Sequence, residues 1–273
     1  MGEDWLEGRR HLLTLIGYQD DATGRVLAAR FQLEHEDTVG YLRQLRGMVE
    51  RYGVPLSLYR DQHGTFQRND KHWTLEEELA GRQSPTQLGR VLEELGIASI
   101  RALSPQAKGR IERMWKTFQD RLKSELRLAR AATVEQANTV LEKFLDDYNA
   151  RFTVPAKEAV SDFRPLSKKL NWDRLFSLKY ERVVGNDHVI VFGARAIQLA
   201  ARRGKFGYAS ARVELSHQLD GQLVVWYGEE RLHRMELPLD YTPGQAPRRP
   251  RGAKKKRPRI YTYAGRPALA VRP

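Results

Sequence analysis

The stretch "HLLTLIGYQDDATGRVLAARFQL", residues 11–33, contains two apolar runs separated by a short polar segment. The segment "DDATG", residues 20–24, carries Asp and Gly where a tight turn needs them. The pattern therefore predicts a strand, a turn and a second strand. Two neighbouring strands that are both apolar indicate a sheet covered by helices on at least one face, which favours an α/β domain.

Helical and strand patterns alternate after this hairpin. "VPLSLY" (54–59) and "IASIRA" (97–102) read as short strands. Gly53 and Gly96 follow two helical patterns, as glycines commonly do at helix ends. These two patterns are carried by apolar residues at helical spacing: Tyr41, Leu45, Met48 and Tyr52, and then Leu88, Val91, Leu92 and Leu95.

The segment "SPQAKGRIERMW", residues 104–115, opens the longest helical pattern of the chain. A second helix is predicted to start at Thr133, with Gln136 as a possible capping-box partner. Each helix has an apolar stripe that we expect to face the core. The first stripe is Ile111, Trp115, Phe118, Leu122, Leu126 and Ala129, and the second is Val134, Ala137, Leu141, Phe144, Leu145 and Tyr148.

The chain as a whole divides into four parts by composition. We expect a core domain over 1–150, a linker over 151–174, a small β-barrel over 175–240 and a disordered basic tail over 241–273. The barrel is expected to be antiparallel, with about five strands. Within it, adjacent Trp226 and Tyr227 should face opposite sides of one strand.

The charge balance points to a polyanionic partner. The 273 residues include 47 Lys and Arg against 34 Asp and Glu, a net charge of +13. A surplus of this size favours nucleic acid as the partner. The absence of cysteine excludes disulfides, cysteine zinc sites and thiol catalysis, and fits a reducing compartment. With no apolar stretch near the ~20 residues of a membrane span, we expect a cytoplasmic, nucleoid-associated protein without a membrane partner.

Two acids stand out by position. Asp61, in "YRDQHGTF" (59–66), follows a predicted strand, where α/β folds usually bind ligands, although it could equally form a turn. Glu112 lies among four cations, Lys108, Arg110, Arg113 and Lys116. Lys108 and Lys116 are one helical turn away on either side, so ordinary ion pairing remains an alternative for Glu112.

Together the two acids suit a divalent-metal site. Mg²⁺ prefers hard oxygen ligands and takes few protein carboxylates, with water and phosphate completing its shell. Two such ions can activate an attacking hydroxyl and stabilise a leaving oxygen. Mg²⁺ or Mn²⁺ held by Asp61 and Glu112 is therefore a hypothesis. In that setting the neighbouring cations would hold a DNA backbone by its phosphates.

The motifs "IGYQDDATGRVLAARF" (16–31), "YRDQHGTF" and "SPQAKGRIERMWKTFQDRL" (104–122) resemble the integrase-core transposases of bacterial insertion sequences, the ISNCY-type group in particular. The resemblance covers about residues 4–165, and less specifically the later barrel and tail. It implies an RNase H-like core with a mixed sheet and flanking helices, followed by an SH3-like barrel. It also implies a retroviral-integrase type of reaction that depends on three acids, Asp, Asp and Glu.

By motif, Asp61 corresponds to the second acid and Glu112 to the third, 51 residues apart. The insertion "QRNDKHWTLEEELAGRQ" (67–83) accounts for the wide spacing. The strand that would carry the first Asp is absent from the printed sequence, in which Asp4 and Trp5 correspond to a pair just after it. We therefore expect an N-terminally truncated core with impaired catalysis, because a bridging metal ligand is missing.

The leading hypothesis is a transposase-derived protein that binds DNA and whose lineage catalyses Mg²⁺-dependent strand transfer. The alternatives are a non-catalytic DNA-binding remnant or accessory subunit of a transposase, and an RNase H-like nuclease that acts on hybrids. Relatives of this kind act as multimers, so the resemblance also implies a homo-oligomer. No small-molecule substrate is expected. The basic tail would add phosphate contacts through Arg248, Arg249, Lys254, Lys255, Lys256 and Arg257.

Overall fold

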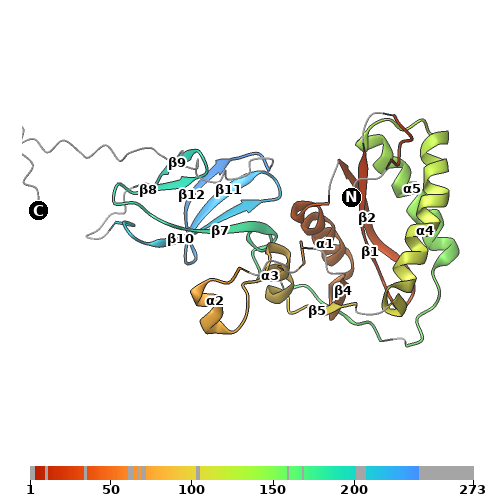
Figure 1. The fold of residues 1–273 in the computed structure, drawn as a ribbon, viewed down its shortest axis with the longest axis horizontal. Coiled ribbons are helices and arrows are strands. Elements are labelled where there is room, and N and C mark those ends of the chain that lie inside the picture. Colours follow the sequence, from red (N-terminus) through yellow and green to blue (C-terminus); the bar gives the residue numbers. More distant parts are fainter. Residues whose placement is uncertain are drawn as a thin grey trace, which may run out of the picture.

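The computed structural model of the chain describes residues 4–9, 12–33, 36–60, 64–66, 68, 72–102, 105–158, 160–167, 169–200 and 207–239, with the backbone alone for 105–108. Helices and strands both occur in this part of the chain, which confirms the mixed α/β class. Figure 1 shows β1 and β2 between α1 and the helix pair α4 and α5, with a β-rich unit at the opposite end of the molecule.

The predicted hairpin is confirmed. Strands β1 (Leu13–Gln19) and β2 (Val26–Leu33) pair antiparallel. Their turn forms because the Asp20 carboxylate accepts a hydrogen bond from the Thr23 amide (3.0 Å), while Gly24 takes a positive φ of 75° that a side chain would strain.

The hairpin has two buried faces, because side chains alternate between its sides, and a β-bulge lies near its turn. Gln19 pairs with Val26 but Tyr18 pairs with Ala28, so one extra residue is accommodated in β2. Residues on one face of the hairpin, among them Leu13 and Phe31, pack into a cluster with α4 and α5. The buried Tyr18 on the other face belongs to a cluster with α1 and α3. The hairpin is therefore buried on both faces, as its continuous apolar pattern predicts.

Helix α1 (Thr38–Tyr52) covers the second of these faces, as predicted (Figure 1). The Asp37 carboxylate caps its first turn by accepting a hydrogen bond from the Gly40 amide at 2.7 Å. Gly53 ends it with a positive φ of 96°.

The predicted strand over 54–59 is two strands. Strand β3 (Val54–Pro55) pairs antiparallel with β6 (Phe163–Arg164), and β4 (Ser57–Arg60) pairs in parallel with β5 (Ala98–Arg101). The two pieces have different partners, which hydropathy alone does not reveal. Helix α3 (Gln87–Glu94) lies between β4 and β5 in sequence, and Gly96 follows its last turn with the expected positive φ (63°).

Helices α4 (Pro105–Leu128) and α5 (Val134–Phe152) pack against the first face of the hairpin (Figure 1). Phe118, Leu122 and Leu126 are fully buried, which confirms the predicted stripe over most of α4. The prediction is wrong at Ala129, which lies beyond the helix and is exposed, whereas Met114 is buried instead. Thr133 caps α5, and the Gln136 Oε1 accepts a hydrogen bond from the Ala132 amide, one residue earlier than in a standard capping box.

The C-terminal unit is antiparallel, as predicted, but the described residues form no closed barrel. After the short helix α6 (Trp172–Leu175), four strands form one sheet in the order β12-β11-β10-β7, and two more form a separate ladder. The sheet consists of β7 (Ser177–Val183), β10 (Arg212–Gln218), β11 (Gln222–Tyr227) and β12 (Glu230–Glu236), and the ladder of β8 (Val189–Phe192) and β9 (Arg195–Gln198).

Packing explains why this sheet stays open. Ile190 and Phe192 of the β8–β9 ladder are fully buried in the apolar cluster of the four-stranded sheet, so the ladder covers a face of the sheet. The outer edge of β7 is partly occupied by α3, because the Gln87 carboxamide bonds both the amide and the carbonyl of Lys179. Trp226 is buried and Tyr227 is 40% exposed, which confirms that they face opposite sides.

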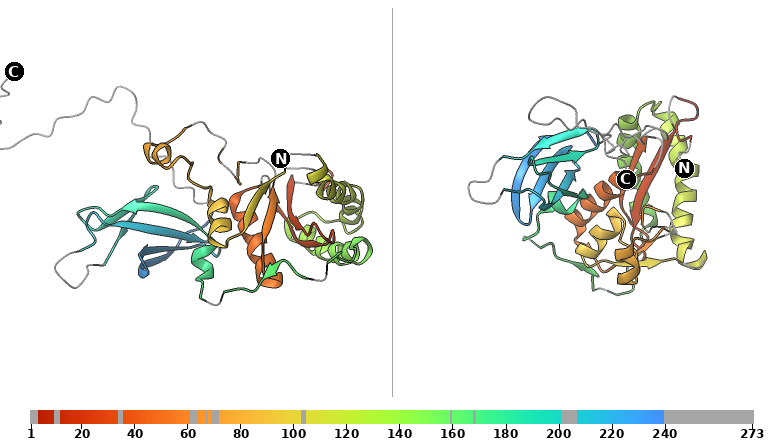
Figure 2. Two further views of the ribbon diagram at one scale, coloured as in Figure 1. Left: turned by 90° about the horizontal axis from the view of Figure 1, so that it is seen from below. Right: turned by 60° about the vertical axis from the view of Figure 1, so that its left-hand side comes forward.

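Several contacts join the C-terminal unit to the core. The Arg90 guanidinium of α3 donates to the Ser177 carbonyl at 2.6 Å, and Lys179 pairs with Glu94 at 3.1 Å. Figure 2 shows the sheet of this unit on the side of α1 and α3, away from α4 and α5. The segment 151–174 contains β6 and the start of α6, and the expected domain boundaries remain predictions.

Candidate metal and nucleic-acid site

The paired strands β4 and β5 bring two distant parts of the chain together at their carboxyl ends. Arg60 and Arg101 are register partners in this parallel pair, and the Ala102 amide donates to the Arg60 carbonyl at 2.9 Å. Asp61 is the next residue after β4 but lies outside the described residues. The end of β4, from which Asp61 continues, is therefore adjacent to the segment that leads into α4.

Glu112 lies two turns into α4 on its solvent-exposed side. On the opposite side of the helix Met114 is buried in the core, and Trp115 lies against the hairpin close to Gly17. Among the residues whose side chains are described, no partner forms an ion pair with the Glu112 carboxylate, and this includes Lys116. The side chain of Lys108 is outside the described part. The alternative of a Glu112–Lys116 ion pair is thus not supported.

The three described cations around Glu112 differ in their contacts. Arg110 approaches the Asp21 carboxylate at 3.6 Å and the Ala22 carbonyl at 3.5 Å, so it bridges α4 to the hairpin turn. Both side chains of this pair are substantially exposed, which makes it a weak interaction. Arg113 and Lys116 are exposed on the same helix. Positive charge therefore surrounds a carboxylate that has no ion-pair partner among the described side chains.

Sequence analysis did not single out the two arginines at the strand ends. Arg101 is exposed, and the Arg60 Nε donates to the Ser99 hydroxyl at 2.7 Å. Their pairing places two guanidinium groups at the edge where Asp61 begins. The signal that could have found them is a basic residue next to the end of each predicted short strand, just after 54–59 and one residue before the end of 97–102.

The remaining predicted site residues lie outside the described part of the chain. These are Arg248, Arg249, Lys254, Lys255, Lys256 and Arg257. Within the described residues, no group of three or more His, Cys, Asp or Glu side chains is placed to hold a metal ion. Because Asp61 is not among those residues, the Mg²⁺ or Mn²⁺ site stays a prediction.

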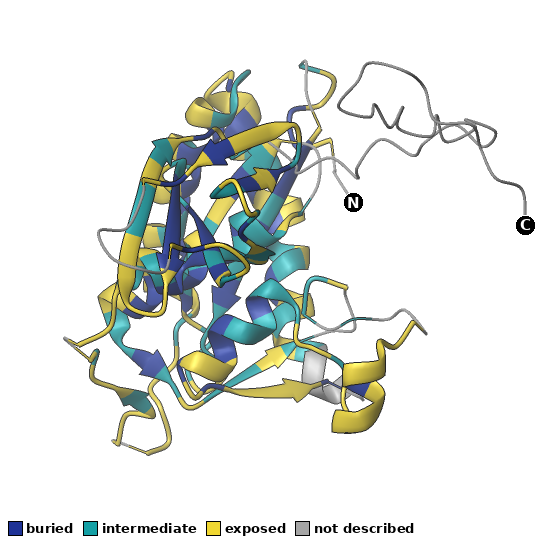
Figure 3. Ribbon diagram, turned by 90° about the vertical axis from the view of Figure 1, so that its left-hand side faces the viewer, coloured by how far each residue is buried: buried dark blue, intermediate teal, exposed yellow. Residues whose placement is uncertain are grey.

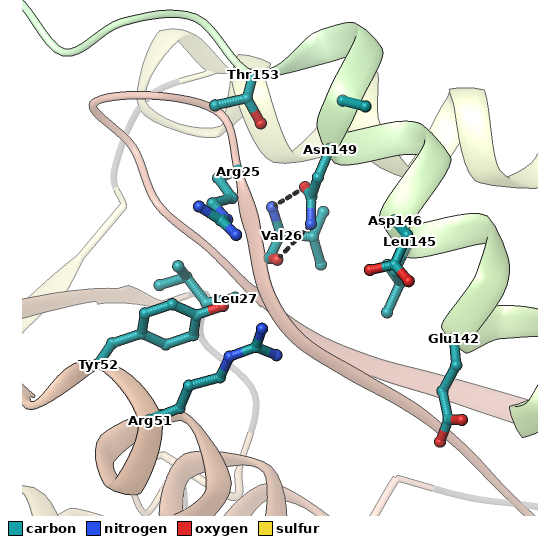
Figure 4. A pocket seen from close by; sticks show the side chains of 11 residues that line it. Arg25, Val26, Leu27, Arg51, Tyr52, Glu142, Leu145, Asp146, Asn149 and Thr153 are labelled. Atoms are coloured by element: carbon teal, nitrogen blue, oxygen red, sulfur yellow. Dashed lines mark hydrogen bonds between the residues drawn. The ribbon is translucent and has the colours of Figure 1, made fainter.

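A groove of ≈ 620 Å³ lies elsewhere, between the end of α1, strand β2 and α5 (Figure 4). Arg25 and Arg51 lie near the Tyr52 ring on one side, at 5.9 and 5.3 Å from its centroid. Glu142 and Asp146 line the α5 side. Carboxylates on one wall would repel a phosphate backbone, so this groove is a poor candidate for the DNA-binding surface.

The chain is similar in sequence to transposases. It is 33% identical over 235 residues to the putative transposase y4bF of Sinorhizobium fredii (strain NBRC 101917 / NGR234), which covers 85% of this chain and 50% of the relative. It is 30% identical over 224 residues to the transposase for insertion sequence IS1202 of Streptococcus pneumoniae, covering 81% of this chain and 46% of that protein.

The chain thus spans about half the length of the curated relatives it matches. No protein-family profile matches it. In the described residues, every helix is too short or too polar to cross a lipid bilayer.

Proposed function

We propose that the chain is a DNA-binding protein of the transposase type, with an integrase-like RNase H core that acts in DNA strand transfer. The observation that carries this proposal is the exposed Glu112 carboxylate among cations on α4. Helix α4 begins four residues after the end of β5, and β5 pairs with β4, the strand that Asp61 follows in sequence. The similarity to two proteins named as transposases supports it.

The reaction proposed is the attack of a DNA 3′-hydroxyl on a phosphodiester of target DNA. The hydroxyl loses its proton to solvent, its oxygen forms a new bond to phosphorus, and the bond to the departing 3′ oxygen of the target breaks, after which that oxygen takes up a proton. Cations would hold the DNA backbone in register by phosphate contacts without reading its sequence. On α4 these are Arg113 and Lys116, with Lys108 and Arg110 beside them. Arg60 and Arg101 at the strand ends would extend the same surface.

The chemistry of the donor set fits Mg²⁺ or Mn²⁺. Glu112 offers an exposed carboxylate that forms no ion pair with a described side chain, and oxygen is the ligand atom that these ions prefer. Asp61 would be the second ligand. When bound, the ions would activate the attacking hydroxyl and stabilise the leaving oxygen. By motif, Asp61 and Glu112 correspond to the second and third of the three carboxylates that the resemblance implies.

A non-catalytic role in DNA binding is the second candidate. The net charge of +13 and the basic segment 248–259 favour it, because both promote phosphate contacts without any need for metal. Such a protein would occupy transposon ends or act as an accessory subunit of a complete transposase.

Strand transfer with pre-cleaved transposon ends and Mg²⁺ or Mn²⁺ separates the two candidates. We expect product from this chain and none from Asp61→Ala or Glu112→Ala, with DNA binding retained by all three proteins. The control is Glu125→Ala, which removes an exposed acid near the far end of α4 and should not change the yield. Product that is unaffected by both site substitutions would refute the metal-site assignment. DNA binding without any product would favour the non-catalytic role.

The contribution of the tail is tested by deleting residues 248–259. Removal of eight Lys and Arg should lower the affinity for DNA and reduce the slope of affinity against salt concentration. An unchanged slope would exclude phosphate contacts by this segment.

A further inference from the structure

Helix α2 (Leu75–Ala80) buries a charged side chain and exposes apolar ones, the opposite of an ordinary surface helix. It lies in the segment between the two predicted metal ligands. Its buried side chain is an acid, Glu77, whereas two of its leucines are exposed. In Figure 3 the helix stands away from the main body and is coloured largely as exposed.

Polar contacts hold α2 in place. Thr74 and Glu77 form a capping box, with the Thr74 amide donating to Glu77 at 3.0 Å and the Glu77 amide donating to Thr74 at 3.2 Å. The Glu77 carboxylate also accepts from the Ser84 amide at 2.9 Å and pairs with Arg68. Gly81 ends the helix in the left-handed conformation. A helix of this length would not persist alone in water, so its contacts fix its shape in advance.

The outer side of α2 is apolar. Trp73 is 41% exposed, Leu75 70% and Leu79 81%. Leu75 and Leu79 are one turn apart and therefore lie on the same side of the helix. We call Trp73, Leu75 and Leu79 the α2 knob. Clustered exposed apolar side chains on a rigid support are typical of a protein contact surface.

The charges around the knob restrict what can cover it. Glu76 and Glu78 are exposed on the same helix, in a chain of net charge +13. An acidic surface repels DNA, so the knob does not suit the DNA partner. It suits a basic surface with exposed apolar side chains. Two knobs could not pair with each other, because their carboxylates would repel.

The same chain carries such a surface at the end of α5. Phe152 is 40% exposed and Val154 55%. The Arg121 guanidinium lies 5.2 Å from the centre of the Phe152 ring, and Arg151 is exposed beside it, in a pair with Asp147 at 2.8 Å. The Val154 amide donates to the Thr23 carbonyl at 3.0 Å, which fixes this segment to the hairpin turn. We call Arg121, Arg151, Phe152 and Val154 the α5 patch.

We propose that the α2 knob of one copy of this chain docks on the α5 patch of a second copy. Both surfaces are exposed within one chain, so neither covers the other there. Leu75 and Leu79 would pack on Phe152 and Val154, while Glu76 and Glu78 would face Arg121 and Arg151. This contact does not depend on the metal chemistry and would form without DNA.

Sedimentation velocity of the full chain, without DNA, tests the docking. A small contact of this kind predicts reversible self-association with a dissociation constant of about 10 µM, so the experiment spans about 1–200 µM. The double substitution Leu75→Ser and Leu79→Ser should weaken association at least about tenfold. The control is Val160→Ser, which removes an 82% exposed apolar side chain that belongs to neither surface and should change nothing.

Charge reversal then tests the acceptor. Glu76→Lys with Glu78→Lys should weaken association, as should Arg121→Glu with Arg151→Glu, and mixing the two variants should restore it. Circular dichroism verifies that each variant folds, which is expected because the side chains are exposed. A chain that stays monomeric up to the highest concentration would overturn the proposal, as would association that is unaffected by the leucine substitutions. Mixed variants that fail to associate would overturn the assignment of the α5 patch.

Discussion

The Asn138 carboxamide forms two hydrogen bonds with the backbone of Phe31, in the way that a neighbouring strand pairs with both the amide and the carbonyl of a residue. Its Oδ1 accepts from the Phe31 amide at 2.8 Å, and its Nδ2 donates to the Phe31 carbonyl at 3.1 Å. Asn149 repeats this arrangement with Val26, at 2.9 and 3.0 Å (Figure 4). Helix α5 thereby satisfies the free edge of β2 at two points, which also protects that edge from pairing with other chains.

Asn138 and Asn149 can both bond β2 because the distance between them along α5 is similar to the distance between Phe31 and Val26 along the strand. Asn138 and Asn149 are separated by 11 residues of helix, a rise of about 16 Å. Phe31 and Val26 are five residues apart in β2, but the bulge takes up one of them, so the two positions span about 13 Å, as do their partners Leu15 and Gln19. The two spans agree to within about one residue of strand, so both asparagines can reach β2 when the two elements run side by side.

We expect Asn138→Ala to lower the free energy of unfolding by about 3 kcal/mol, because it leaves a buried amide and a buried carbonyl of Phe31 without partners. Urea denaturation measures the change. Asn149→Ala is the matched variant. It removes the same pair of bonds at a half-buried position, where water can replace them, so its effect should be about 1 kcal/mol. Equal effects would contradict the role given to burial.

Gly53→Ala should destabilise the protein by about 3 kcal/mol. The residue has a positive φ of 96°, and a Cβ there would lie 2.6 Å from the Arg164 carbonyl oxygen, which is held in strand β6. Gly47→Ala in the same helix is the control. Apart from its chain neighbours and the nearby backbone of the helix itself, no atom would lie within 4 Å of its Cβ, so the substitution should stabilise by up to about 1 kcal/mol. Thermal unfolding of the two variants should show shifts of opposite sign.

Helix α2 should loosen in acid. Hydrogen bonds from the backbone amides of Thr74 and Ser84 lower the pKa of Glu77 to about 2. Because the unfolded pKa is about 4.3, the stabilisation is fully present above that value and is lost as the pH falls through the folded pKa. We expect the amide proton shifts of Thr74 and Ser84 in NMR spectra to move between about pH 4 and pH 2. Glu77→Gln should abolish this transition and disorder α2 at neutral pH. A transition that persists in the variant would contradict the assignment to Glu77.

Gln87→Ala should loosen the contact between α3 and the C-terminal sheet. The variant leaves the Lys179 amide and carbonyl at the edge of β7 without their partners. Hydrogen exchange at the Lys179 amide should accelerate at least about tenfold, which corresponds to the loss of about one hydrogen bond's net contribution. Exchange at Leu215 in the sheet interior is the reference and should not change. Unaltered exchange at Lys179 would contradict this docking.

The apolar patterns of the hairpin and of α4 and α5 were sufficient to predict these elements, because each has a regular period over many residues. The short strand at 54–59 was predicted as one element and is two, since pairing with β6 and with β5 is a contact over long sequence distances. The open C-terminal sheet was missed for the same reason. Whether the sheet closes into a barrel depends on the contacts of α3 with β7 and of the β8–β9 ladder with the sheet, and hydropathy does not encode these contacts.

The candidate site also combines residues that local spacing predicts with residues that only strand pairing brings together. Glu112 and its cations were found from local spacing, because residues on one helix turn are near each other by geometry alone. Arg60 and Arg101 come from strands that are far apart in sequence, and their juxtaposition at the end of a parallel pair was not predicted. Asp61 lies outside the described residues, so its place beside Glu112 remains a prediction.

By itself the sequence determined the features that depend on neighbouring residues: the hairpin and its turn, the helices with their caps and stripes, the net charge, and the cations around Glu112. Only the tertiary structure decided which strands pair, which side chains satisfy a strand edge, and which side of α2 faces solvent. The physical reason is that backbone geometry sets local contacts, whereas edge pairing and burial depend on chain segments brought together by folding.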